Sequence, residues 1–287
     1  MAALLVPEPA ETPLRTVEVD GQALAYRRRG DGAAEAVLLL HGITTHSFLW
    51  EPVLAAHGGP GGRDVVAVDL LGCGASAKPI DVSYALPAHA ARIARFCAAL
   101  GLERVHLVGH DVGGGIAQIL AVERPALVRS LTLINTVGYD FWPVQPISAL
   151  RTPIVRQLMM AALDAGALTA VVRRGLYHRE LISPALMAQF RAPLATAEGR
   201  KAFVHFARCL DNSDLTGIAA ALRGISIPTA ILWGMADRYL PFAIAARLAA
   251  EIPGARLVRI ATAGHFVPID EPALLAEVLR EQFDAAR

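Results

Sequence analysis

Short apolar runs alternate along the chain with longer stretches in which apolar residues recur at helical spacing. The apolar runs rich in β-forming residues cover residues 16–20, 22–27, 35–40, 64–69, 104–109, 130–135, 229–233 and 255–260. Segments with helical period, such as 88–100 and 116–123, separate the later runs. Asp20-Gly21, between the first two runs, is a hairpin signal. The pattern predicts an α/β fold: a mostly parallel twisted sheet with helices on both faces, entered by antiparallel strands.

The strand pattern disappears between residues 139 and 223. This segment predicts several helices, broken at Pro143, Pro146, Pro153, Pro184 and Pro193. We interpret it as a helical cap, or lid (139–223), inserted into a core domain formed by residues 1–138 and 224–287. A lid over the carboxyl ends of the strands would close a pocket where open α/β sheets bind ligands.

Composition and charge narrow the classes of partner. The 287 residues are 54% hydrophobic and 18% charged, against about 45–50% and about 25% in ordinary globular domains, so a large core is expected. Lys and Arg number 27 and Asp and Glu 26, a net charge of +1. Such a balance does not attract nucleic acid or an anionic membrane surface, and we expect neither as a partner.

The cysteines and the first residues of the chain indicate the cellular compartment. Cys73, Cys97 and Cys209 are odd in number and lack C-x-x-C spacing, so neither a disulfide framework nor a zinc cluster is predicted. The opening residues have no basic flank and too short an apolar run for a signal peptide. We therefore expect a cytoplasmic protein.

The stretch Leu107 to Gln118 carries the main chemical signal. Its sequence, LVGHDVGGGIAQ, runs from a strand through small residues into a helix, with Asp111 between glycines at the turn. The serine form of this arrangement projects a nucleophile at a sharp strand-to-helix turn. An aspartate at this position can also cap the helix, and this stretch alone leaves both roles open.

Two further loops favour the catalytic role. Asp237 follows the apolar strand that ends at Trp233, and His265 follows the next strand, ahead of a helix that begins near Glu271. The order nucleophile, acid, histidine, each beyond the carboxyl end of a strand, is that of α/β-hydrolases.

With these residues the sequence resembles the α/β-hydrolase superfamily, from about Val17 to Phe283. The segment 41–45, His-Gly-Ile-Thr-Thr, matches the His-Gly loop that supplies an oxyanion-hole amide, and 69–76, Asp-Leu-Leu-Gly-Cys-Gly-Ala-Ser, matches the Asp-x-x-Gly-x-Gly-x-Ser loop. The aspartate at the turn narrows the resemblance to the branch that contains epoxide hydrolases and dehalogenases. The fold implied is the α/β-hydrolase fold with an inserted helical lid.

The resemblance implies a covalent mechanism. Asp111 would attack an sp³ carbon and form an alkyl ester. His265, oriented by Asp237, would deprotonate the water that hydrolyses this ester. Backbone N–H groups of Ile43 and Val112 would hold the oxyanion.

The leaving group distinguishes the family members. Epoxide hydrolases use lid tyrosines to protonate the opening epoxide oxygen, for which Tyr177 and Tyr139 are the candidates. In haloalkane dehalogenases a Trp follows the nucleophile and an Asn or second Trp cradles the halide, whereas Val112 and Ile43 hold these positions here. We expect epoxide hydrolysis, with dehalogenation as the alternative.

Other readings remain open. Asp111 and His265 could serve as acid and base of a non-hydrolytic cyclase or lyase, or the fold could be a ligand sensor. We expect a small apolar substrate and water as the partners, and His41, Phe141, Trp142 and Phe266 in the pocket. No cofactor or metal is expected. Gly109 to Gly115 does not follow the dinucleotide-binding pattern G-x-G-x-x-G, and Gly72 to Lys78 lacks the Gly-Lys-Ser/Thr ending of a P-loop. The sequence leaves a homodimer open.

Overall fold

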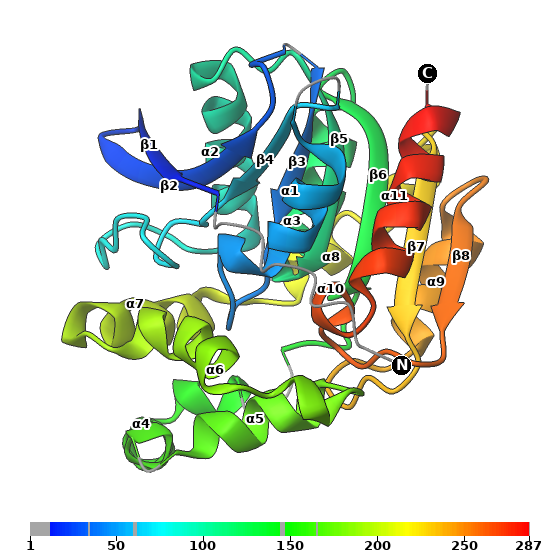
Figure 1. Cartoon of the computed structure of the whole chain (residues 1–287). Helices are drawn as coiled ribbons and strands as arrows, with labels where there is room; N and C mark the ends of the chain where they lie inside the picture. The colour runs from blue at the N-terminus through cyan, green and yellow to red at the C-terminus, as the bar shows by residue number, and fades with distance from the viewer. Residues whose placement is uncertain (1–11, 34, 60–61, 144–146, 165, 287) are drawn as a thin grey trace, which may run out of the picture.

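The computed structural model describes residues 12–33, 35–59, 62–143, 147–164 and 166–286. Eight strands in this part of the chain form one sheet (Figure 1). They are β1 (Leu14–Val19), β2 (Gln22–Arg29), β3 (Glu35–Leu40), β4 (Val65–Val68), β5 (Arg104–Asp111), β6 (Val128–Thr136), β7 (Thr229–Gly234) and β8 (Arg256–Ile260). The spatial order is β1-β2-β4-β3-β5-β6-β7-β8. The pairs β1–β2 and β2–β4 are antiparallel, and the pairs from β4 to β8 are parallel.

The hairpin between β1 and β2 follows from two residues. Asp20 and Gly21 have φ of 55° and 70°. Two central residues with positive φ are what a two-residue hairpin turn of type I′ requires, and Asp-Gly is a favoured pair for it. The hairpin and the mostly parallel sheet predicted from the sequence are both present, which confirms the predicted fold class.

Helices cover both faces of the sheet and form two separate cores. On one face pack α2 (Leu86–Ala99), α3 (Val112–Glu123) and α9 (Ala243–Glu251). On the other pack α1 (Glu51–His57) and α11 (Pro272–Ala285). Because both faces are covered, the central strands are continuous apolar runs, and Val37 to Leu40 of β3 are fully buried.

The strand order reverses at β3, and this places the site. In sequence β3 is followed by β4 and then β5, but in space β4 lies on one side of β3 and β5 on the other. The connections after β3 and β5 therefore leave in opposite directions and open a crevice at the carboxyl ends of these strands. The His41–Ile43 loop follows β3, and Asp111 is the last residue of β5.

Between β6 and β7 the described residues form helices only. They are η2 (Ser148–Arg151), α4 (Pro153–Asp164), α5 (Ala167–Gly175), η3 (Arg179–Leu181), α6 (Pro184–Arg191), η4 (Ala192–Leu194), α7 (Ala197–Cys209), α8 (Ser213–Thr216) and η5 (Ala221–Gly224). In Figure 1, α4 to α7 lie together beyond the strand ends toward which the β7 and β8 arrows point. We call this group, Ser148 to Cys209, the cap.

Proline and hydroxyl residues mark the cap helices. Pro153 and Pro184 are the first residues of α4 and α6, where a proline costs no intrahelical hydrogen bond. The side chains of Ser183 and Thr196 accept hydrogen bonds from the first turns of α6 and α7. Pro146, also predicted to break a helix, lies outside the described residues.

Two helices start earlier than their apolar period suggests. The predicted segments 88–100 and 116–123 begin in the structure at Leu86 and Val112. Val112 precedes three glycines, which are poor helix formers, so the sequence shows no helix there. The helix nevertheless includes them because of their tertiary contacts: Gly113 lies against the backbone of Leu40 and His41, and Gly114 against Thr136.

No single helix in the described ranges combines the length and apolarity needed to cross a bilayer. Only together, across a bend of 89°, do Pro153–Ala162 and Ala167–Gly175 meet that criterion.

Candidate active site

Asp111 lies at a strained turn between β5 and α3. Its φ of 53° and ψ of −122° are rare for a residue with a side chain. Nearby glycines are required by close contacts: a Cβ on Gly109 would lie 2.5 Å from the Gly113 carbonyl oxygen, and one on Gly113 would lie 2.4 Å from that of Leu40. Asp111 occupies the N-cap position of α3, but its side chain makes no capping hydrogen bond. The carboxylate is thus available to the crevice.

The loop after β3 brings backbone N–H groups to this carboxylate. Ile43 N donates to Asp111 Oδ2 over 3.1 Å, and the backbone N–H of Val112 also acts to lower the pKa of this carboxylate. Gly42 permits the approach, because a Cβ there would lie 2.7 Å from Asp111 Cβ. Of the two N–H groups expected from the sequence, that of Ile43 donates to the Asp111 carboxylate, and that of Val112 belongs to the next residue and favours its charged form.

His41 supports this loop and does not line the cavity, so its expected place in the pocket is corrected. His41 Nε2 accepts a hydrogen bond from Leu70 N over 2.9 Å, and Nδ1 lies 2.7 Å from the Gly42 carbonyl oxygen. Burial lowers the pKa of His41 to about 4. A neutral imidazole with its proton on Nδ1 satisfies both contacts.

Asp237 and His265 meet in the loops after β7 and β8. His265 Nδ1 lies 2.9 Å from Asp237 Oδ2. Asp237 Oδ1 accepts hydrogen bonds from the N–H groups of Tyr239, over 2.7 Å, and Leu240, over 3.1 Å. Asn135 Nδ2 donates to Asp237 Oδ2 over 2.7 Å. The carboxylate is held from several sides, and His265 Nε2 keeps no hydrogen-bond partner among the described residues.

The three ionisable groups shift one another's pKa. Burial raises the pKa of Asp111, partly offset by His265 and by the two N–H groups. Burial opposes charge on His265, but Asp237 and Asp111 outweigh it and raise its pKa above the ordinary value of 6.5. Burial likewise opposes charge on Asp237, yet its contacts with His265 and the N–H donors lower its pKa. The arrangement favours two carboxylates around a readily protonated imidazole.

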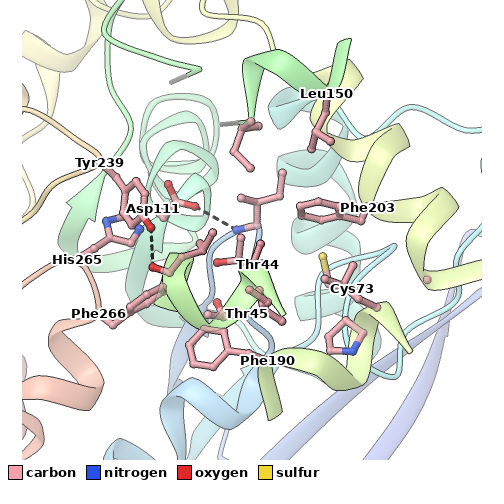
Figure 2. A pocket seen from close by; sticks show the side chains of 18 of the residues that line it. Thr44, Thr45, Cys73, Asp111, Leu150, Phe190, Phe203, Tyr239, His265 and Phe266 are labelled. Carbon is pink, nitrogen blue, oxygen red and sulfur yellow. Dashed lines mark hydrogen bonds between the residues drawn. The ribbon is translucent and has the colours of Figure 1, made fainter. Parts of the chain in front are cut away.

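A cavity of about 290 Å³ lies between the core and the cap (Figure 2). Asp111 and His265 both line it, and most of the other lining side chains are apolar. Its wall is formed by Ile43, Thr44, Thr45, Gly72, Cys73, Asp111, Ile147, Leu150, Ala162, Ala167, Leu168, Val171, Phe190, Pro193, Leu194, Gly199, Phe203, Tyr239, Leu240, His265 and Phe266. The carboxylate and imidazole therefore face a small apolar space.

Among the hydroxyl groups on this wall, that of Thr44 is uncommitted. Tyr239 donates its hydroxyl proton to the Val171 carbonyl oxygen over 2.6 Å. Thr45 Oγ1 exchanges hydrogen bonds with the backbone of Gly42. Thr44, next to Ile43, is half-buried, and its hydroxyl has no hydrogen-bond partner within the described residues. It is free to donate to a molecule in the cavity.

The two tyrosines expected to act as acids lie elsewhere. The Tyr139 ring is buried, with its hydroxyl donating to Glu251 Oε2 over 3.2 Å and the Arg247 guanidinium 3.7 Å from the ring centroid. Tyr177 is 47% exposed. Neither lines the cavity, because Tyr139 packs against α9 and the Tyr177 side chain faces solvent.

Of the three aromatic residues expected in the pocket, one lines the cavity and two do not. Phe266 lines the cavity, where its ring packs against Phe190 of α6 at 5.3 Å between centroids. Trp142 is buried and Phe141 is 38% exposed, and neither belongs to the cavity wall. Phe266 reaches the cavity because it directly follows His265, whereas Phe141 and Trp142 lie where the chain leaves the sheet.

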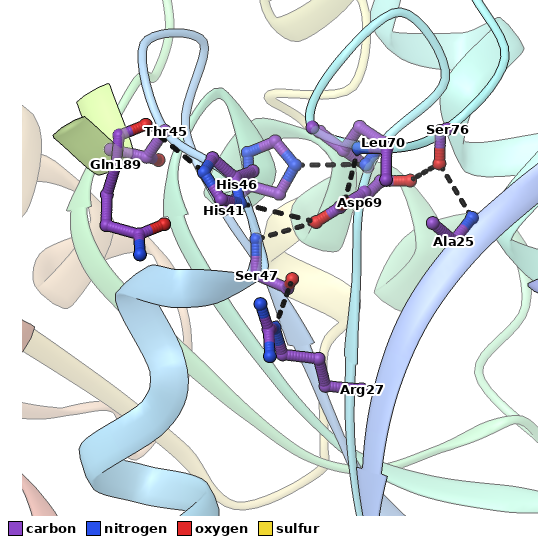
Figure 3. A network of polar contacts seen from close by, with 12 residues as sticks. Ala25, Arg27, His41, Thr45, His46, Ser47, Asp69, Leu70, Ser76 and Gln189 are labelled. Atoms are coloured by element: carbon purple, nitrogen blue, oxygen red, sulfur yellow. Dashed lines mark hydrogen bonds and ion pairs between the residues drawn. The ribbon is translucent and has the colours of Figure 1, made fainter. Parts of the chain in front are cut away.

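A network of polar contacts holds the Asp69 loop, whose Gly72 and Cys73 line the cavity (Figure 3 shows the network). Asp69 Oδ1 accepts from Ser47 N over 2.7 Å, and Oδ2 accepts from Ala75 N over 2.8 Å. Ser76 Oγ donates to the Asp69 carbonyl oxygen over 2.6 Å. These bonds fold the loop so that Cys73 lines the cavity, and burial raises the pKa of its thiol. Cys73 is therefore a wall residue in its unreactive thiol form.

Sequence reasoning missed Asn135, Thr44 and Tyr239. Asn135 lies at the carboxyl end of β6, next to the strand that carries Asp111, and a polar residue at that place was the available signal. Thr44 and Tyr239 lie inside the motif segments already singled out. Nothing in their spacing indicates which hydroxyl is free. Across the described part of the chain, His, Cys, Asp and Glu side chains nowhere gather in a group of three or more that could hold a metal ion.

Comparison with known proteins agrees with this fold. A family model described as alpha/beta hydrolase fold matches residues 35–272. The chain belongs to the α/β-hydrolase fold family, in the branch with an aspartate at the nucleophile position, and it is a hydrolase of that family.

Its relatives include proteins that are named for their activities. Haloalkane dehalogenase 2 of Mycobacterium tuberculosis (strain ATCC 25618 / H37Rv) is 30% identical, over 99% of this chain and all of the relative. The putative carbamate hydrolase RutD of Pantoea ananatis is 29% identical over 86% of this chain and 87% of its own. The crystal structure of haloalkane dehalogenase DbeA from Bradyrhizobium elkani USDA94 has a TM-score of 0.81 and 29% identity, covering 95% of this chain and 99% of that chain.

Proposed function

We propose that this hydrolase cleaves the carbon–halogen bond of small apolar molecules through an ester formed on Asp111. The observation that carries the proposal is an apolar cavity that presents a carboxylate and a histidine together but, among the residues that the structure describes, no uncommitted acid. The similarity to haloalkane dehalogenases over nearly the whole chain supports it. In this proposal residues 139–223 act as the lid over the core domain.

The first step needs no proton transfer. A carboxylate oxygen of Asp111 attacks the carbon, the new C–O bond forms as the carbon–halogen bond breaks, and the halide leaves with the bonding electron pair. Close approach of substrate and carboxylate in the apolar cavity supplies much of the rate. The backbone N–H of Ile43 holds Asp111 in position, over 3.1 Å.

The second step uses the histidine. His265 takes a proton from a water molecule, whose oxygen attacks the carboxyl carbon of the Asp111 ester. The N–H groups of Ile43 and Val112 stabilise the resulting oxyanion. The alcohol leaves, Asp111 is regenerated, and one proton per halide passes to solvent. Asp237 keeps His265 in the tautomer with its proton on Nδ1.

Leaving-group chemistry favours a halide over an epoxide oxygen. A halide ion departs without a proton, whereas an opening epoxide generates an alkoxide that needs an acid. Tyr139 and Tyr177 do not reach the cavity wall, and Tyr239 donates to Val171, with burial raising the pKa of its phenol to about 12. Epoxide hydrolysis, favoured by the sequence, therefore has weaker support than dehalogenation.

Thr44 is the group proposed to receive the halide. The side chains of Ile43 and Val112 donate no hydrogen bond. The Thr44 hydroxyl lies on the same wall and is free to donate a hydrogen bond, but it is no stronger an acid than the alcohol that an opened epoxide forms, so proton transfer from it would only exchange one alkoxide for another. A cavity with a donor and no acid suits a leaving group that departs as a stable anion.

The test is to incubate the enzyme with panels of short chloroalkanes, bromoalkanes and epoxides, and to measure halide and product. Wild type is expected to release halide catalytically. His265→Phe is expected to release one halide per enzyme and to keep the alkyl group on the peptide that carries Asp111, seen by mass spectrometry. Hydration of epoxides with no halide release from any haloalkane would overturn the proposal. A product isomerised without added water would instead support the cyclase or lyase reading.

A further inference from the structure

The Asp270 carboxylate gathers backbone N–H groups from two distant segments. It lies in α10 (Val267–Asp270) and is only 6% exposed. Gly264 N donates to Oδ2 over 2.8 Å, and His178 N donates to Oδ1 over 2.9 Å. Tyr177 N lies 3.1 Å from both oxygens. A buried carboxylate with several N–H donors is a strongly held junction, because charge-assisted hydrogen bonds are stronger than neutral ones.

This junction joins the cap to the loop that carries His265. Gly264 directly precedes His265, whereas Tyr177 and His178 follow α5 of the cap. A second bond lies beside it: His265 N donates to the Gly175 carbonyl oxygen over 2.7 Å. The two backbones approach closely, since a Cβ on Gly264 would lie 2.3 Å from that same oxygen. The backbone that carries the His265 imidazole is therefore hydrogen-bonded both to Asp270 of the core and to Gly175 of the cap.

We propose that Asp270 is a positioning residue for His265, holding its loop against cap residues Tyr177 and His178. Asp270 does not line the cavity and touches no reacting atom. It acts through Gly264, whose N–H it binds, on the direction of the imidazole. Without this carboxylate three backbone N–H groups, that of Gly264 buried, lose their acceptor, and the loop is expected to move so that those groups find another. The inference rests on the proposed function for its kinetic consequence.

Loss of the Asp270 carboxylate is expected to slow ester hydrolysis and not ester formation. Ester formation on Asp111 needs no base, whereas ester hydrolysis needs His265 placed beside a water molecule. A fault confined to the position of His265 therefore slows the second step and spares the first. A general loss of structure would slow both.

The experiment compares Asp270→Asn with wild type in single turnovers of a bromoalkane. The amide keeps the shape but turns one acceptor into a donor. We expect the rate of bromide release to stay within about twofold, and the decay of the Asp111 ester to slow roughly 10- to 100-fold. Asp284→Asn is the matched control, because this carboxylate pairs with Arg63 near the surface, and it should behave as wild type.

A second measurement does not depend on the reaction. In the free enzyme the Nδ1 proton that His265 shares with Asp237 should give a distinct NMR signal, which Asp270→Asn is expected to broaden or shift and Asp284→Asn is not. Equal slowing of both steps, or an unchanged ester decay with an unchanged signal, would refute the positioning role. The two proposals can fail separately. If His265→Phe accumulates no ester on Asp111, the covalent mechanism is wrong. If Asp270→Asn nevertheless changes the NMR signal of the His265 Nδ1 proton, the positioning role of Asp270 is supported.

Discussion

Asp111 and His265 are coupled through charge, and this coupling changes during the reaction proposed above. In the free enzyme the Asp111 carboxylate is one cause of the raised pKa of His265, together with Asp237, against the opposing effect of burial. Formation of the ester converts Asp111 into a neutral group. One of the contributions that favour the imidazolium is then lost, so His265 becomes a free base more readily just when it must accept a proton.

This predicts two different pKa values for the same histidine. Because only neutral His265 can take a proton from water, the rate of ester hydrolysis falls as pH is lowered through its pKa. The acid limb of kcat, when ester hydrolysis limits it, should lie at lower pH than the titration of His265 in the free enzyme, which we expect above 6.5. NMR titration of the imidazole and a pH–rate profile give the two values. Coincident values would show that the Asp111 charge does not contribute.

The second prediction at this scale concerns Thr44. Thr44→Val keeps the shape and removes the hydroxyl. If that hydroxyl solvates the departing halide, the loss of a hydrogen bond to an anion costs about 1.5–3 kcal/mol, or roughly 10- to 150-fold in kcat/KM. The loss should be larger for chloride than for iodide, which is the better leaving group. Thr16→Val on the exposed side of β1 is the control. Equal rates for both variants would remove Thr44 from the mechanism.

At the scale of elements, the β5–α3 unit shows how packing overrides local propensity. Three glycines follow Val112 in the first turn of α3, although glycine is a poor helix former. The helix starts there because the chain passes against the end of β3, where Gly113 contacts the Leu40 backbone without room for a Cβ. The strained backbone of Asp111 is thus maintained by contacts between neighbouring elements.

Gly113→Ala should therefore be costly despite the higher helix propensity of alanine. Its Cβ would lie 2.4 Å from the Leu40 carbonyl oxygen, which forces the backbones apart. We expect the free energy of unfolding to fall by about 1–3 kcal/mol and the reaction rate to fall as well. Gly224→Ala is the control, since no atom lies within 4 Å of its added Cβ, and stability there should be unchanged or up to about 1 kcal/mol higher. Denaturant titration measures both, and a neutral Gly113→Ala would contradict the argument.

The strands were the most predictable elements. Each expected run lies within a residue or two of an observed strand. For the buried parallel strands the reason is that they need continuous apolar residues whatever their neighbours are. The cap was predictable only as a set of helices. Phe190 of the cap packs with Phe266, and Leu168 and Val172 belong to the same cluster. Such long-range contacts cannot be predicted from the spacing of apolar residues within one helix.

At the scale of the whole molecule, the cavity is shared between core and cap. Asp111 and His265 come from the core, whereas Phe203 of α7 and Leu150 of η2 come from the cap. A volume of about 290 Å³ suits a small substrate. The groups proposed to react therefore come from the strand ends and loops at the sheet edge, and side chains of the cap limit the size of the substrate.

We predict that Phe203→Ala shifts the preference toward longer substrates. Removal of the ring enlarges the cavity on the cap side without touching Asp111 or His265. The ratio of kcat/KM for a long bromoalkane to that for a short one should rise several-fold, roughly 10-fold at most. Phe141→Ala, half-exposed and outside the cavity wall, should leave the ratio unchanged. A ratio that changes only in Phe141→Ala would place the substrate elsewhere.

The amino-acid sequence was sufficient for the sheet, for the order Asp111, Asp237, His265, and for the loop that carries Ile43. These depend on short-range rules: strand composition, turn residues, and the placement of loops at strand ends. The tertiary structure alone decided which hydroxyl faces the cavity, that Tyr139 binds Glu251 and not a substrate, and that Asp270 joins the cap to the histidine loop. Such contacts join segments some 90 or more residues apart, and their geometry is set by packing between elements, which a linear pattern does not contain.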